Sequence, residues 1–93
     1  MHTAEALEHA LDAAARLGYE VRHDWLGGSG GGGCVLKGRK LLLVDLALGT
    51  VEQLDQVLDA LRHDAEAPKL PMPQALRDLL TSAPLEPEFL QLR

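Results

Sequence analysis

The sequence is poor in the residues that several functional classes require. Cys34 is its only cysteine, which excludes an internal disulfide framework and a multi-cysteine zinc site and is typical of a reducing compartment. Aromatic residues make up 3% of the chain, too few to offer a stacking surface to nucleobases. The longest strictly apolar run, residues 41–44, is far shorter than the roughly 20 residues that cross a bilayer as a helix.

Positive charge is scarce as well. The chain has 9 Lys and Arg against 14 Asp and Glu, a formal net charge of −5, whereas binding to a phosphate backbone needs a basic surface. Its 4 histidines show no metal-ligand spacing. The first residues include Glu5 and Glu8 and lack the apolar core of a signal peptide. We therefore expect a cytoplasmic protein without a nucleic-acid partner, membrane contact, metal or cofactor.

What the sequence does contain is a change of hydrophobic period that is typical of an α+β domain. Apolar residues recur at helical spacing over residues 7–17 and then alternate with polar residues over 19–25. Two more strands flank a turn at 37–40, and two helices follow, at 50–63 and 73–83. The predicted order is α-β-β-β-α-α, a three-stranded, largely antiparallel sheet with an N-terminal helix and two C-terminal helices. The apolar face of the first helix is predicted to consist of Leu7, Leu11, Ala14 and Leu17.

One domain is expected at residues 1–83, followed by a tail at 84–93. The strand at 41–46 is apolar on both faces, which favours a central place in the sheet. The helices can cover one of these faces, but Leu41 and Leu43 on the other need a different cover. Either the tail folds back over them or a second subunit does, and we predict a homodimer. The interface residues expected are Leu41, Leu43, Phe89, Leu90 and Leu92.

Six of the seven positions at 27–33 are glycine. A phosphate-binding P-loop is not expected, because Arg39 and Lys40 stand where that motif has Lys and Ser or Thr, and because the segment runs into a strand. The segment fits a mobile loop between two strands, with a close backbone approach at Gly32 and Gly33. An engineered linker and an anion or small-ligand site remain alternatives. The ligand site would combine Gly30, Gly31, Lys37, Arg39 and Lys40.

A few side chains could carry chemistry. Cys34 starts a strand beside the glycine segment, and His23 lies on the preceding strand. If these strands pair antiparallel, thiol and imidazole become neighbours, which is the arrangement of a nucleophile and its base. The alternative is that both are ordinary core residues. Asp45 interrupts the most apolar strand, and it is expected to mark that strand's exposed end or to bind backbone amides.

The layout of helix, strand, hairpin and second helix resembles the amino-terminal half of the ImmA/IrrE zinc-peptidase family. In that family a strand like residues 41–45 precedes a helix that carries HExxH. The corresponding segment here is Asp59-Ala60-Leu61-Arg62-His63, in which only His63 matches, so the resemblance implies the layout and no peptidase activity. The pattern from Gly31 through Cys34 and Gly38 to Asp45 is also similar to short uncharacterised bacterial proteins.

These observations favour a non-catalytic domain that works as a homo-oligomer or an adaptor for protein–protein interaction. Two alternatives stay open. One is a small enzyme or relic metal site that uses Cys34 with His23, or His63. The other is the anion or small-ligand site of the glycine segment and its neighbouring basic residues.

Overall fold

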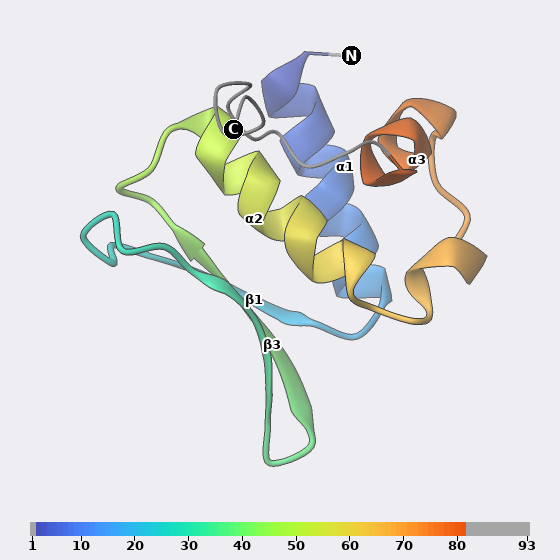
Figure 1. Ribbon diagram of the computed structural model, residues 1–93. Helices are drawn as coiled ribbons and strands as arrows, with labels where there is room; N and C mark the ends of the chain where they lie inside the picture. The colour runs from blue at the N-terminus through green and yellow to red at the C-terminus, as the bar shows by residue number, and fades with distance from the viewer. Residues whose placement is uncertain (1, 82–93) are drawn as a thin grey trace, which may run out of the picture.

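The computed structural model describes residues 2–81 of the chain. The predicted α+β class and the order of elements are confirmed, with one added 3-10 turn before the last helix (Figure 1). The tail at 84–93, with the predicted interface residues Phe89, Leu90 and Leu92, lies outside the described residues. The elements are α1 (Thr3–Arg16), β1 (Glu20–Asp24), β2 (Gly32–Leu36), β3 (Arg39–Asp45), α2 (Thr50–Arg62), η1 (Ala67–Lys69) and α3 (Gln74–Thr81).

The sheet is mixed, whereas we expected a largely antiparallel one. Its order is β1-β3-β2, so β3 is the central strand that its two apolar faces predict. β2 pairs with β3 antiparallel, as a hairpin must, but β1 pairs with β3 parallel. The reason is the path of the glycine segment: it leads the chain from β1 across the end of β3 to the opposite edge of the sheet, so that no hairpin joins β1 to β2.

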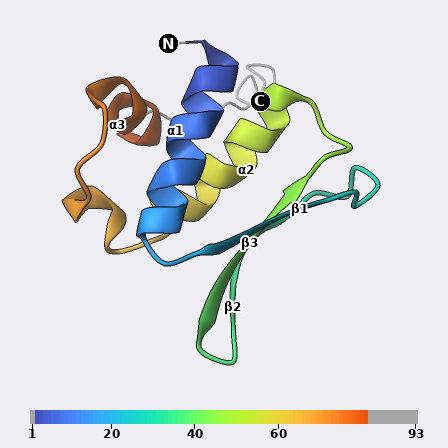
Figure 2. The same ribbon diagram turned by 180° about the vertical axis from the view of Figure 1, so that it is seen from behind.

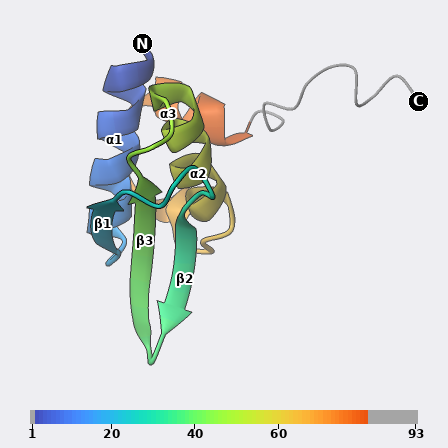
Figure 3. The same ribbon diagram turned by 90° about the vertical axis from the view of Figure 1, so that its left-hand side faces the viewer.

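The hairpin of β2 and β3 turns tightly and extends beyond the helices (Figures 2 and 3). Its turn consists of Lys37 and Gly38, both with positive φ, at 53° and 78°. Two such residues between paired strands make a type I′ turn, which matches the twist of the strands. Because the hairpin extends beyond the helices, its outer half is not covered by them, and Val35 and Leu36 are exposed there.

α1 and α2 lie side by side over one face of the sheet (Figure 1). Leu42 and Val44 of β3 are fully buried beneath them. The buried face of α1 differs from our prediction, because Leu7, Leu11 and Leu17 are only partly buried. Alanines let two helices approach closely, so the alanine face of α1 packs into the core and the longer leucines lie at its border. The buried residues of α1 are Ala6, Ala10, Ala13 and Ala14.

The second face of the sheet has no helix over it in the described part of the chain (Figure 1). Leu41 and Leu43 lie on this face and are half-buried. Their partners across the ladders are Glu20 and Cys34 for Leu41, and Arg22 and Gly32 for Leu43. Among residues 2–81 no helix is long and apolar enough to cross a membrane.

Candidate functional site

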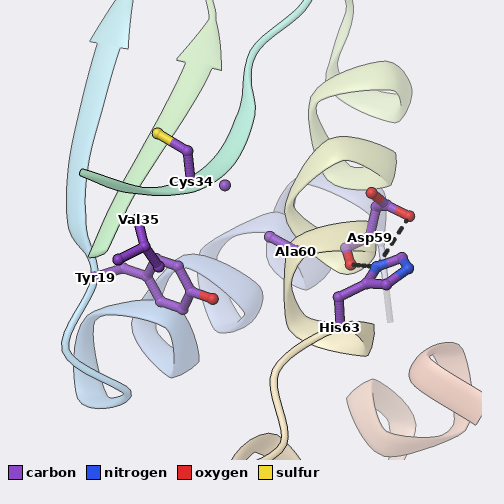
Figure 4. Close-up of a pocket in the computed structure, with 7 residues that line it drawn as sticks. Tyr19, Cys34, Val35, Asp59, Ala60 and His63 are labelled. Atoms are coloured by element: carbon purple, nitrogen blue, oxygen red, sulfur yellow. Dashed lines mark hydrogen bonds and ion pairs between the residues drawn. The ribbon is translucent and has the colours of Figure 1, made fainter. Parts of the chain in front are cut away.

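A shallow pocket of about 420 Å³ lies between the edge strand β2 and helix α2 (Figure 4). Gly33 and Ala60 keep its floor open: a Cβ added at Gly33 would lie 3.0 Å from the Cβ of Ala60 and 3.6 Å from Cε1 of Tyr19. Val35, two residues along the same strand face, is 69% exposed at its rim. The lining residues are Tyr19, Gly33, Cys34, Val35, Asp59, Ala60 and His63.

Cys34 borders the pocket, but its side chain points away from it. Alternation along β2 directs Cys34 to the helix-free face, opposite Leu41, and Figure 4 shows the sulfur turned away from His63. His23 does not pair with Cys34 either, because β3 lies between β1 and β2 and the register places His23 beside Val44, on the helix-covered face. The proximity of Cys34 and His23, expected only if their strands paired antiparallel, therefore does not occur. Both residues are exposed, so the alternative that they belong to the core is wrong as well.

His63 lies on the opposite wall of the pocket, just after α2. Its Nδ1 is 2.8 Å from the carbonyl oxygen of Asp59 and 3.6 Å from that residue's Oδ1. Both side chains are exposed, so the contact is a local one within the helix end. Within residues 2–81 no group of three potential ligands is placed to hold a metal ion.

Tyr19, which lines the pocket, forms a polar cluster with Lys40 and Asp64 that sequence reasoning missed. Lys40 Nζ lies 2.8 Å from Asp64 Oδ2 and 4.4 Å from the centroid of the Tyr19 ring, and it donates to the carbonyl of Leu17 over 2.9 Å. The Asp64 side chain is only 6% exposed. Lys40 therefore joins β3 to the ends of α1 and α2, and it is not a solvated residue of the hairpin tip.

The cluster shifts two pKa values in opposite directions. Burial, reinforced by a hydrogen bond to Asp64 and by that residue's charge, raises the pKa of Tyr19 to about 12. Burial alone would raise the pKa of Asp64 as well. Hydrogen bonds from Lys40, the Glu66 amide and the Tyr19 hydroxyl outweigh that effect, so the pKa of Asp64 lies below its ordinary value. Asp64 therefore remains a carboxylate beside a protonated phenol.

Asp45 organises the glycine segment. Its side chain is fully buried, and its carboxylate accepts the amides of Leu26 and Gly30 at 3.0 Å and of Ala47 at 2.9 Å. Burial raises the pKa of Asp45, but these amides, together with that of Gly28, outweigh it and hold the pKa below its ordinary value. The binding of backbone amides expected of Asp45 is thus present. The segment itself offers few side chains to hold it, and a carboxylate from β3 does so instead.

The close backbone approach lies at Gly31, beside the predicted Gly32 and Gly33. A Cβ at Gly31 would lie 1.9 Å from the carbonyl oxygen of Leu43, a separation that no side chain allows. Gly32 has a φ of +134°, which favours glycine for a different reason. Gly31 and Gly32 therefore each need glycine for a structural reason that involves no ligand.

The residues of the predicted ligand site do not come together. Gly30 and Gly31 precede β2, whereas Lys37 lies in the turn at its far end. Arg39 pairs with Glu20 of β1 on the helix-free face, and Lys40 points to the other face, into the cluster with Asp64. Lys37 and Arg39 therefore line a shallow hollow on the helix-free face, apart from Lys40 and from the two glycines.

The chain matches no protein-family model, and no match is found among curated proteins or solved structures.

Proposed function

We propose that this chain is a non-catalytic interaction domain that self-associates as a homodimer. One observation carries the proposal: within residues 2–81 helices cover one face of the sheet only, and the edge strand β2 is exposed along most of its length. A soluble domain rarely leaves an uncharged strand edge open to water, and on the helix-free face Leu41 and Leu43 are only half-buried. A partner that covers the edge and these leucines removes them from water. The compartment we propose is the cytoplasm, because a lone cysteine favours a reducing environment.

The enzyme alternative finds less support. A nucleophile needs a base within hydrogen-bond reach, yet Cys34 and His23 belong to opposite edges and opposite faces of the sheet. His63 contacts Asp59 alone among acidic side chains of the described residues. The anion alternative is weakened by Asp45, because its carboxylate already takes the amides of Leu26, Gly28 and Gly30 that an external anion would need.

Sedimentation equilibrium of the full chain and of a chain ending at Ala83 tests the proposal. We expect a dimer for the full chain at micromolar concentration, with the shortened chain showing whether the tail contributes to the interface. A full-length monomer that dimerises only after truncation would identify the tail as an intramolecular cover and would refute the homodimer.

A further inference from the structure

The two edge strands of the sheet differ sharply in how they are protected against association. β1 carries Glu20, Arg22 and Asp24 on one face, and charged side chains on an edge strand discourage pairing with another sheet. β2 has the sequence Gly-Gly-Cys-Val-Leu, without a charge or a proline, and four of its five residues are exposed. Of the two edges, β2 is the one open to a further strand.

The backbone of β2 presents two residues to such a strand. Leu36 faces Arg39 across the two-residue turn, and this pair is joined by the hydrogen bond that closes the turn. Hydrogen-bonded and non-hydrogen-bonded pairs alternate along an antiparallel ladder. Gly33 and Val35 therefore direct their N–H and C=O groups away from β3, and within residues 2–81 no loop or helix backbone pairs with them.

We infer that β2 pairs antiparallel with β2 of a second copy, about a two-fold axis that passes beside Cys34. Gly33 of one copy then faces Val35 of the other, and their outward N–H and C=O groups form reciprocal hydrogen bonds. This inference rests on the proposed homodimer and specifies its interface. The two sheets become one continuous sheet across both copies, which removes the open edge.

The side chains of β2 complement themselves in this register. Val35, 69% exposed in the single copy, comes to lie beside the partner's Gly33, where the absent Cβ leaves the floor of the pocket open between Tyr19 and Ala60. Leu36, 56% exposed, comes to lie beside the partner's Gly32 on the helix-free face. In each case a large apolar side chain lies opposite a glycine, so the pocket is completed by a residue of the second copy.

Charge favours the same arrangement. Antiparallel pairing brings the basic turn of each copy, with Lys37, past the far end of the partner's β2. At that end Gly30 lies against Gln56 of α2. The same helix carries Asp55 immediately before Gln56 and Asp59 about one turn after it. An unrelated extended peptide could add to the same edge. Nothing requires such a peptide, however, to place a large apolar side chain opposite Gly33 and a basic turn beside α2.

Disulfide cross-linking through the native Cys34 tests this interface. At a two-fold axis the Cys34 pair occupies a non-hydrogen-bonded site, with Cα atoms about 4.5 Å apart, within the roughly 4.4–6.8 Å that a disulfide spans. Diamide, which oxidises two thiols to one disulfide, should therefore convert most of the full-length protein to a covalent dimer. The matched control is Cys34→Ser with Leu36→Cys: the new thiols lie two residues on either side of the axis, about 13 Å apart along the strand, and should not cross-link.

The possible results separate the interface from the proposed function. Sedimentation as a dimer, with cross-linking at position 34 and little at 36, supports both. A dimer that does not cross-link at 34, or that cross-links equally at 36, overturns the β2 interface and leaves the homodimer. A monomer overturns both. Val35→Asp provides a second measurement: the side chain is exposed in one copy, so its circular dichroism should match the parent, while its dimer dissociation constant should rise at least tenfold.

Discussion

At the scale of single residues, two buried carboxylates, one at the end of β3 and one just after α2, explain features that the sequence leaves open. Asp45 binds the amides of the glycine segment, and Asp64 binds Lys40 and the Tyr19 hydroxyl. The role of Asp45 could be predicted, since a carboxylate in an apolar strand needs donors. The role of Asp64 could not, because Lys40 and Asp64 meet only through the packing of β3 against the end of α2, and no local spacing encodes that contact.

Replacing Asp45 by Asn should loosen the glycine segment. The carboxamide keeps one oxygen acceptor and turns an NH₂ donor toward amides that are themselves donors, so some of the bonds to Leu26 and Gly30 are lost. We expect faster hydrogen exchange at these two amides and a lower urea midpoint. Asp24→Asn is the control, because the exposed side chain of Asp24 accepts the amide of the neighbouring Trp25 and does not hold the glycine segment. Unchanged exchange at Leu26 and Gly30 would contradict the role given to Asp45.

Tyr19 is the only tyrosine, so its ionisation can be followed directly by the ultraviolet absorbance of the phenolate. The folded protein should titrate with a pKa near 12, and the urea-unfolded chain near the ordinary value of about 10. Because the folded pKa is raised, the protonated phenol's contribution to stability is complete below pH 10 and is lost as the pH rises through 12. Asp64→Asn removes the adjacent charge and should lower the folded pKa. A folded pKa near 10 would show that the hydroxyl is solvated.

At the scale of elements, local periodicity predicts which elements form, but it does not predict how they pair. The helices and strands fall where the apolar spacing places them, and the two apolar faces of β3 correctly indicate its central position. The parallel pairing of β1 depends on the path of the glycine segment across the end of β3. That path is fixed by Asp45 and by the contact of Gly31 with Leu43, which are non-local interactions.

Gly31 is predicted to be the least replaceable residue of that segment. In Gly31→Ala the new Cβ would overlap the carbonyl oxygen of Leu43 at 1.9 Å, so the strands must separate locally. Overpacking of this kind costs about 1–3 kcal/mol or more of unfolding free energy. Gly27→Ala is the control: its positive φ costs about 1–2 kcal/mol, but nothing lies within 4 Å of the new atom. Chemical denaturation should rank Gly31→Ala as the more destabilised; the reverse order would argue against the close approach.

The packing of α1 on its alanine face gives a second test at this scale. Ala10 is fully buried, so Ala10→Leu should force α1 away from its neighbours and cost about 1–3 kcal/mol of unfolding free energy. Ala15→Leu, on the exposed side of the same helix, should change stability by no more than about 0.5 kcal/mol. If α1 instead buried the leucine face that the sequence suggested, Ala10→Leu would have only a mild effect. Urea denaturation of the two variants therefore shows which face of α1 is buried.

At the scale of the whole molecule, the two carboxylates tie together parts of the chain that the sheet alone does not join. Asp45 attaches the loop between β1 and β2 to the end of β3, and Asp64 attaches β3 to the end of α2. Each carboxylate has a pKa below its ordinary value because donors surround it. Both attachments therefore depend on the same protonation state, and acid should weaken them together.

The stability of the protein should accordingly fall in acid. A carboxyl group whose pKa is lower in the folded than in the unfolded state stabilises the fold above its unfolded pKa, about 3.9 for Asp, and this contribution is lost as the pH falls toward the folded pKa. The urea midpoint, measured at one fixed protein concentration because association adds to apparent stability, should decline below about pH 4. The double variant Asp45→Asn, Asp64→Asn should start lower and decline less. Asp12→Asn, at an aspartate whose side chain is 65% exposed, should follow the parent curve; a double variant with the parent's full pH dependence would place the acid-sensitive groups elsewhere.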